Sequence, residues 1–183
     1  MVSDTIQVVV ADERHLCYVD DILSAIREAA KVSTNSIVVR DPSYLADKIR
    51  EGKAVIAVEG AIFVGFCYVE TWQDGEFVAN SGLIVRPEYR GRGIAWRIKQ
   101  QVFQLCRQRF PEARIFGLTK SPAVRKMNAH LGYREVPYAQ LTTDSGLWKG
   151  CSTCPHYHQL IANDMKSCAC TAMLFSPSPS GER

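Results

Sequence analysis

The segment that most constrains the fold of this chain is Gly82 to Trp96, GLIVRPEYRGRGIAW. It opens with the apolar end of a strand, crosses a loop that contains Gly91 and Gly93, and continues as an amphipathic helix. The two glycines let the backbone approach a ligand closely. The first turn of a helix adds N–H groups without helical partners and the positive end of the helix dipole. The segment therefore predicts a cradle for a phosphate or pyrophosphate, which the nearby arginines reinforce.

The cradle does not match two common phosphate-binding motifs. No Gly-Lys-Ser/Thr follows it, which excludes a Walker loop, and the three-glycine spacing of the dinucleotide fingerprint is absent. The arginines of the segment and its helix are spread around the helix, and the net charge is only +3. This distribution does not provide a groove-reading face, so we expect no nucleic-acid partner.

The rest of the chain alternates strand-like and helix-like patterns. Expected strands lie at 5–11, 54–59, 61–72, 77–85, 113–119, 133–143 and 168–175. A first helix follows Asp12 as N-cap, and the others span 42–51, 94–110 and 122–131. Ser121 is the expected N-cap of the last helix, and Gly132 ends it. The order predicts a single mixed α/β domain without internal repeats.

Composition limits the setting in which the protein works. The chain has 183 residues, of which 46% are hydrophobic and 22% charged, as in globular proteins with one core. No apolar run is long enough to span a bilayer, and the first residues do not resemble a secretory signal. The seven cysteines are odd in number, and several lie within apolar runs. These features predict a cytoplasmic protein with reduced thiols and no membrane partner.

The residues Arg90-Gly91-Arg92-Gly93-Ile94-Ala95 fit the pattern Gln/Arg-x-x-Gly-x-Gly/Ala. In this the chain resembles the GNAT superfamily of acyl-CoA-dependent N-acetyltransferases. The stretch AVIAVEGAIFVGFCYVE is similar to that family's second and third strands, and the element order agrees from Thr5 to about Leu141. The resemblance implies a GNAT fold, an α/β domain whose single mixed, mostly antiparallel central sheet is flanked by helices and has splayed fourth and fifth strands.

The same resemblance implies a site for the co-substrate acetyl-CoA. Backbone amides of residues 92–95 face the CoA pyrophosphate, and the strand edge at 83–85 pairs with the pantetheine arm. The implied cofactor-binding residues are Leu83, Ile84, Val85, Arg90, Gly91, Arg92, Gly93, Ile94, Ala95, Ser121 and Asn128.

Two positions depart from the family pattern near the reacting groups. The family's later helix begins with Asn and often carries a Tyr seven residues on, which is proposed to protonate the thiolate. Here Ser121 and Asn128 occupy those positions. An amide can stabilise a thiolate but cannot protonate it as a phenol does. His130 and Tyr133 are the nearest alternatives in sequence, and we assign no general acid.

The general base is equally open. Many family members carry a Glu on the fourth strand, whereas residues 79–81 here are Ala, Asn and Ser. Glu70, at the end of the third strand, and Glu76, in the following turn, can reach inward or simply be solvated. No catalytic residue is therefore assigned from the sequence.

Cysteines gather near the C-terminus as Cys151, Cys154, Cys168 and Cys170. Cys-x-x-Cys and Cys-x-Cys pairs could complete a tetrahedral zinc site, although the second pair is tighter than usual. Core packing and a redox-sensitive disulfide between Cys151 and Cys154 are the alternatives. We divide the chain into a GNAT core at 1–145, a Cys-rich insert and last strand at 146–175 that complete the same domain, and a disordered tail at 176–183.

The sequence thus predicts an enzyme that moves an acetyl group from acetyl-CoA to a primary amine by direct attack. The expected acceptor is a small molecule such as an amino acid, whose carboxylate could pair with Arg40 or Lys31. The alternative is a non-catalytic acyl-CoA-binding sensor, which the missing Tyr and Glu favour. The sequence does not decide whether the protein forms a homodimer.

Overall fold

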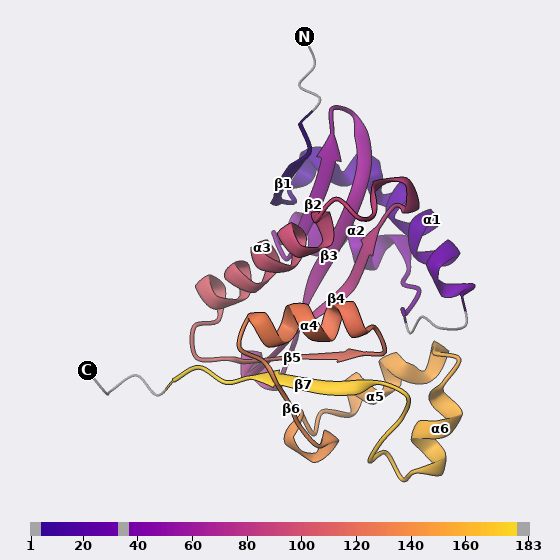
Figure 1. Ribbon diagram of the computed structural model, residues 1–183, viewed down its shortest axis with the longest axis vertical. Coiled ribbons are helices and arrows are strands. Elements are labelled where there is room, and N and C mark those ends of the chain that lie inside the picture. The colour runs from indigo at the N-terminus through magenta and orange to yellow at the C-terminus, as the bar shows by residue number, and fades with distance from the viewer. Residues whose placement is uncertain (1–4, 33–36, 179–183) are drawn as a thin grey trace.

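The computed structural model describes residues 5–32 and 37–178, which form one sheet flanked by helices (Figure 1). Seven strands within these residues follow the order β1-β2-β3-β4-β5-β7-β6. The β4–β5 pair is parallel and the other neighbouring pairs are antiparallel, as the predicted fold class requires. The strands are β1 (Gln7–Val10), β2 (Ala54–Glu59), β3 (Ile62–Trp72), β4 (Phe77–Val85), β5 (Arg114–Thr119), β6 (Arg134–Glu135) and β7 (Thr171–Phe175).

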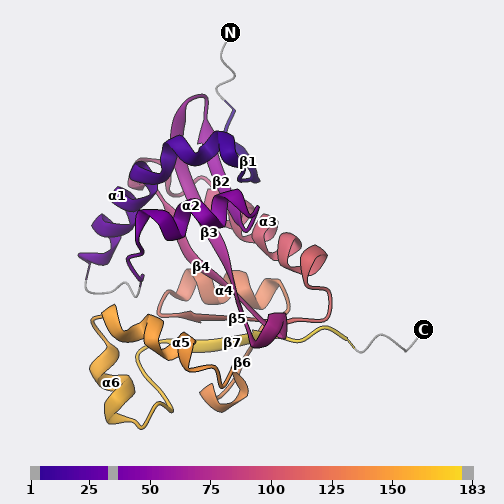
Figure 2. The same ribbon diagram turned by 180° about the vertical axis from the view of Figure 1, so that it is seen from behind.

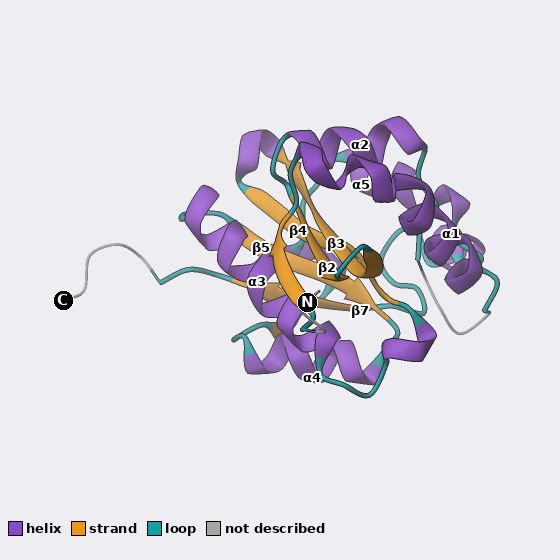
Figure 3. Ribbon diagram, turned by 90° about the horizontal axis from the view of Figure 1, so that it is seen from above, coloured by secondary structure: helices purple, strands orange, loops and turns teal. Residues whose placement is uncertain are grey.

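Helices cover both faces of this sheet. Helices α3 (Ile94–Arg109) and α4 (Pro122–His130) lie on one face, and α1 (Val19–Ala30) and α2 (Pro42–Arg50) lie on the other (Figures 1 and 2). Two short helices, α5 (Ser145–Gly150) and α6 (Tyr157–Ala162), lie beside the β5 and β7 end, and α5 is on the α2 side (Figure 3). The layered arrangement buries apolar side chains on each face.

The helices form where apolar residues recur at helical spacing. In α3, which was predicted as an amphipathic helix, the apolar stripe of Ile94, Ile98, Val102 and Leu105 is buried against the sheet. In α1 the buried residues are Ile22, Leu23, Ile26 and Ala29. The sequence periodicity therefore identified the faces that these two helices present to the core.

The first helix begins later than expected. Asp12 does act as an N-cap and forms a capping box with His15, but the element that it caps is the 3-10 helix Glu13–Tyr18. The α-helix starts only at Val19. Ser121 caps α4 as predicted, because its side chain accepts a hydrogen bond from the amide of Val124.

Strands β4 and β5 diverge after three residue pairs. Phe77, Val78 and Ala79 pair with residues 114–116, whereas residues 117–119 of β5 pair with β7 on the other edge and have no partner on β4. From Asn80 onward β4 is bonded to β3 only. This confirms the expected splay of the fourth and fifth strands and opens the middle of the sheet.

The region after α4 differs from the prediction. The strand expected at 133–143 is limited to Arg134–Glu135, and Pro137 precedes the 3-10 helix Tyr138–Gln140. Proline has no backbone N–H to donate to a ladder, so it ends the strand. The cysteine-rich segment contains α5 and α6, which the sequence did not indicate. The disordered tail expected at 176–183 lies mostly outside the described residues.

Candidate active site

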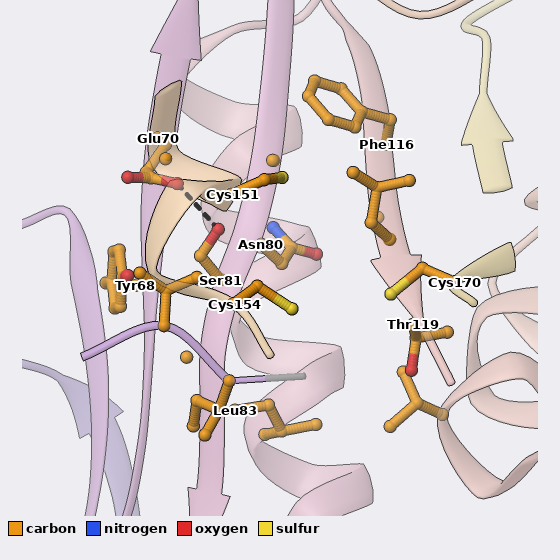
Figure 4. A pocket seen from close by; sticks show the side chains of 18 of the residues that line it. Tyr68, Glu70, Asn80, Ser81, Leu83, Phe116, Thr119, Cys151, Cys154 and Cys170 are labelled. Atoms are coloured by element: carbon orange, nitrogen blue, oxygen red, sulfur yellow. Dashed lines mark hydrogen bonds between the residues drawn. The ribbon is translucent and has the colours of Figure 1, made fainter. Parts of the chain in front are cut away.

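A cavity of about 870 Å³ lies where β4 and β5 diverge. Side chains on opposite faces of the sheet line it, because strand residues alternate between faces. Glu70 and Tyr68 are paired with Ala79 and Ser81 and share the α1–α2 face. Asn80 points to the other face, toward α3 (Figure 4). The cavity therefore joins the two faces of the sheet through the splay.

The start of α3 has the backbone geometry that the predicted anion cradle requires. Gly91 and Gly93 have φ angles of 77° and 74°, the left-handed region that glycine tolerates best. A Cβ atom built at either glycine meets no heavy atom within 4 Å. The amide of Arg97 bonds to the carbonyl of Gly93, so the amides of residues 94–96 come before the helical ladder. These amides and the open space beside the glycines suit a bound anion.

Most arginines of this segment bond to backbone or side-chain groups of the protein and are not free for a ligand. Nε of Arg90 donates to the carbonyl of Val85 at 3.0 Å, which fixes the end of β4. Arg86 pairs with Glu88, and Arg97 donates to the carbonyl of Ile6. Arg92 lies over the ring of Tyr89 and is half exposed. The backbone is therefore the main part of the cradle, with Arg92 at its rim.

The strand edge expected to pair with a ligand is free on the splayed side. Ile84 and Val85 of β4 pair with β3 and not with β5, and both line the cavity together with Leu83. A bulge interrupts the β3–β4 register here, and Gly82 within it has a φ of 65°. A Cβ atom on Gly82 would lie 2.4 Å from Cε1 of Tyr68. Only glycine fits this bulge, which turns the edge of β4 toward the splay.

Of the two carboxylates considered from the sequence, Glu70 reaches the cavity. Its side chain is buried and receives hydrogen bonds from Nη2 of Arg40 at 3.0 Å, from the Tyr44 hydroxyl and from Oγ of Ser81 at 2.9 Å (Figure 4). Glu76 is exposed and pairs with Arg114 at the surface. The end of β3, and not the following turn, supplies the acidic group of the site.

Cationic and phenolic groups surround Glu70. Nε of Arg40 also donates to the Tyr68 hydroxyl at 3.1 Å, and Lys48 lines the same part of the cavity. Burial lowers the pKa of Lys48 and raises that of Tyr68 to about 12, so the Tyr68 phenol stays protonated at neutral pH. Lys31 is exposed and paired with Glu28. Of the two cations predicted to pair with the carboxylate of an acceptor, Arg40 therefore lies at the site and Lys31 does not.

The α4 positions that depart from the family pattern both line the cavity. The hydroxyl of Ser121 is committed to capping α4. Asn128 is fully buried, and its Nδ2 donates to Sδ of Met173 at 3.7 Å. Its Oδ1 has no hydrogen-bond partner among the described residues. A buried acceptor without a donor is costly, which suits an N–H or S–H group of a ligand in the cavity.

The other two acid candidates on this side do not line the cavity. His130 is exposed at the end of α4, with its ring edge-on to Trp96. Tyr133 is buried behind β4, where its hydroxyl donates to Oδ1 of Asn80 at 3.0 Å. Burial raises the pKa of Tyr133 well above its usual value.

The four clustered cysteines line the α5–α6 side of the cavity, and all are free thiols. Across residues 5–32 and 37–178, no group of three or more His, Cys, Asp or Glu side chains is arranged to hold a metal ion. The zinc site predicted at Cys151, Cys154, Cys168 and Cys170 is therefore not assembled. Cys168 instead contacts the Tyr138 hydroxyl at 2.9 Å. Hydrogen bonds from Cys170 and Tyr138 lower the pKa of Cys168.

Sequence reasoning missed Lys99, a buried lysine in the cavity wall. Its Nζ donates to Oδ1 of Asn80 at 3.1 Å. A lysine beside an apolar helical stripe normally predicts a solvated flank. One feature of the sequence could have indicated that Lys99 is buried. It lies one turn after Ala95 and one turn before Val102, and both of these side chains pack against the core.

Comparisons with known proteins identify related folds. The model of the acetyltransferase (GNAT) family matches residues 23–133. A search of curated protein sequences gave no significant match. Among the described residues, the helices include none that is both long and apolar enough to span a membrane.

Several solved structures share the fold at low sequence identity. N-acetylglutamate synthase from Neisseria gonorrhoeae, solved with coenzyme A and N-acetyl-glutamate, has a TM-score of 0.68 and 14% identity over 95% of this chain, which spans only 35% of that protein. Rv2747 from Mycobacterium tuberculosis, solved with CoA, has a TM-score of 0.69 and 16% identity over 94% of this chain and 99% of its own. The putative acetyltransferase yncA from Salmonella typhimurium, solved with acetyl-CoA, has a TM-score of 0.65 and 13% identity, with 98% of each chain covered.

Proposed function

Because the chain belongs to the GNAT acetyltransferase family, we propose that it transfers an acetyl group from acetyl-CoA to the primary amine of a small molecule such as an amino acid. The observation that carries this proposal is the cavity through the splayed sheet. An anion cradle opens on one face, and a buried carboxylate lies on the other. Donor and acceptor can therefore enter from opposite faces and meet between β4 and β5.

The donor half fits acetyl-CoA. The amides at the start of α3 are suited to the pyrophosphate, and the free edge at residues 83–85 can bond an extended arm as a further strand does. The unpaired Oδ1 of Asn128 can accept a hydrogen bond from that arm. Several structural neighbours were solved with CoA or acetyl-CoA, which supports the assignment. When bound, acetyl-CoA supplies the thioester carbonyl that the amine attacks.

The acceptor half offers a base and two cations. Glu70 is held by three donors with its carboxylate at the cavity wall, so it can take the proton that an ammonium must lose before attack. Arg40 and Lys48 lie beside it and favour an acceptor that also carries a carboxylate. The gonococcal neighbour that was solved with N-acetyl-glutamate supports an amino acid.

Transfer by direct attack requires no acyl-enzyme. Glu70 accepts a proton from the acceptor ammonium, and the neutral amine forms a bond to the acetyl carbonyl carbon. Collapse of the tetrahedral centre breaks the carbon–sulfur bond, the thiolate leaves, and the nitrogen loses its second proton to solvent water. The protein orients the two reactants in the cavity, which accounts for a large part of the rate of such a reaction.

The experiment is an acetylation assay with acetyl-CoA and a panel of amines, followed by release of free thiol. Each amino acid in the panel is paired with the amine that lacks its α-carboxylate. We expect turnover, with kcat/KM higher for the member of a pair that has the carboxylate. Equal rates within pairs would contradict the amino-acid acceptor. Tight CoA binding without turnover of any amine, including peptides and polyamines, would instead favour the non-catalytic sensor.

A further inference from the structure

Lys99 is a cation in an unusual position. It lies in the second turn of α3 with an exposed fraction of 3%. Its Nζ donates to Oδ1 of Asn80 at 3.1 Å and lies 5.3 Å from the centre of the Tyr133 ring. In the described part of the chain, no carboxylate lies within ion-pair distance of Nζ. The ammonium therefore has one neutral acceptor and an aromatic face.

Such an arrangement does not favour folding. Burial of an ammonium without a counter-charge is costly, and a well-packed apolar side chain is often more stable in its place. The titratable groups that face Lys99 are Cys67 on β3, Cys106 on α3 and Tyr133 after α4. Burial raises the pKa of Cys67 to about 11 and that of Cys106 to about 12, and raises the pKa of Tyr133, so all three are neutral near pH 7. None of them provides the missing negative charge.

Lys99 lies beside the point where β4 and β5 separate. Asn80 is the first residue of β4 beyond the last pair with β5. Its Oδ1 also accepts a hydrogen bond from Tyr133, and its Nδ2 lies 3.2 Å from Sγ of Cys106. These bonds fix the Asn80 amide, and the amide in turn holds Nζ at the point where the strands separate. Lys99 and Asn80 both line the cavity, on the face where the α3 cradle opens.

We propose that Lys99 is the general acid that protonates the leaving thiolate of CoA. The inference rests on the proposed acetyl transfer. A negative charge develops on sulfur as the carbon–sulfur bond breaks, and Lys99 lines the same cavity as the β4 edge and the start of α3, which would hold the CoA arm. Protonated Nζ has three N–H bonds, of which Asn80 takes one, so the others are available to the sulfur. Lys99 thus supplies the proton that Asn128, in place of the family's Tyr, cannot give.

The protons balance over one turnover. Glu70 gains the first proton that the acceptor nitrogen loses, and the second passes to solvent water as the tetrahedral centre collapses. Lys99 gives one proton to the thiolate, so that CoA leaves as a thiol. The enzyme is then left with a protonated Glu70 and a neutral Lys99. Release of one proton from Glu70 to solvent and uptake of one by Lys99 restore the starting state, and one proton in all is released per turnover.

The first test compares acyl donors with the unaltered protein. The acetyl thioester of 4-nitrothiophenol releases a weakly basic thiolate that needs no proton. With acetyl-CoA, kcat should fall as pH rises through the pKa of Lys99, because the acid form is lost. Burial lowers that pKa, so the fall occurs below the range of an ordinary lysine. The fall should be absent with the activated thioester, and the same alkaline fall with both donors would overturn the proposal.

The second test is Lys99→Met, which keeps the length and apolar stem of the side chain. We expect kcat with acetyl-CoA to fall on the order of 100-fold, the lower end for general acid catalysis. The KM for acetyl-CoA should change little, and the fall of kcat at alkaline pH should disappear. With the activated thioester, the kcat of the variant should be close to that of the unaltered protein. The control is Lys166→Met, whose lysine is exposed and paired with Asp164, and it should match the unaltered protein.

These measurements separate the inference from the function on which it rests. If the unaltered protein transfers no acetyl group, the proposed function fails. If it does and Lys99→Met retains its kcat and pH profile, only the role of Lys99 fails. A Lys99→Met deficit of equal size with both donors would indicate a structural role and would also contradict the proposal. If that variant does not fold, the donor comparison with the unaltered protein decides.

Discussion

Glu70 illustrates how a single side chain takes its role from its neighbours. It lies near the end of β3, where an acidic residue is ordinarily solvated. Here the chain that follows α1 brings Arg40, and α2 brings Tyr44, so that both donate to the carboxylate, while Ser81 on β4 donates from beside it. The carboxylate is thus buried, satisfied and directed toward the space between the strands.

At the residue scale we predict that Glu70→Gln abolishes most of the activity. The substitution keeps the shape of the side chain but removes the proton acceptor, and kcat should fall by roughly 10²- to 10⁴-fold. Glu76→Gln is the matched control, since Glu76 is exposed and paired with Arg114, and its kcat should be unchanged. Steady-state kinetics with the best acceptor measure both. Loss of activity in the control, or full activity of Glu70→Gln, would exclude Glu70 as the base.

At the element scale, the beginning of α3 combines two requirements. The loop must pass through left-handed conformations at Gly91 and Gly93, and the helix must leave its first amides unobstructed. The same helix then buries an apolar stripe under β1 to β4. One continuous segment therefore provides both the packing of a sheet face and an opening for an anion.

We predict that Gly93→Glu prevents CoA binding without unfolding the protein. The new side chain meets open space, so the structural cost is that of a left-handed residue, roughly 1–2 kcal/mol. Its carboxylate repels an anion at the helix N-terminus, and the Kd for CoA should rise on the order of 100-fold. The control is Gly52→Glu, at a glycine with a φ of 62° after α2. Titration calorimetry should show normal CoA affinity for the control, and an unchanged Kd for Gly93→Glu would refute the cradle.

At the scale of the whole molecule, the C-terminal part of the chain completes the sheet. Strand β7 lies between β5 and β6, although β6 precedes it in the sequence. Leu147 and Leu160 from α5 and α6 pack with Phe77 and Phe116 from β4 and β5 in one apolar cluster. We therefore propose that residues 146–175 form one cooperative unit with the GNAT core and enclose the acceptor side of the cavity.

The neighbouring residues Leu160 and Ile161 test this unit. Leu160 is 1% exposed and Ile161 is 54% exposed. Leu160→Ala should destabilise the protein by about 2–5 kcal/mol, because it leaves a cavity in the shared cluster. Ile161→Ala should have little effect. Thermal unfolding should show a single transition that shifts for Leu160→Ala, and two separate transitions would contradict a single domain.

The sequence by itself determined most elements and indicated the glycine-containing loop at the start of α3 as an anion site. The strand at 77–85, the helix that starts at Ile94, the cap at Ser121 and the cradle at residues 90–95 follow from local patterns of apolar spacing, capping and glycine position. Such patterns involve residues that are close together in the sequence, so they can be recognised without the tertiary structure. The family resemblance then gave the splayed sheet.

Only the tertiary structure decided which charged side chains are buried at the cavity. Glu70 and Glu76 have the same side chain and lie six positions apart, yet β3 carries one into the cavity and the turn leaves the other in solvent. Lys99 appears on the flank of a helix in the sequence, and it is buried because β4 lies against that flank. The clustered cysteines suggested a metal, but among the described residues no three His, Cys, Asp or Glu side chains are arranged to hold one. Burial and partners arise from segments distant in the chain, and that is why no local pattern could reveal them.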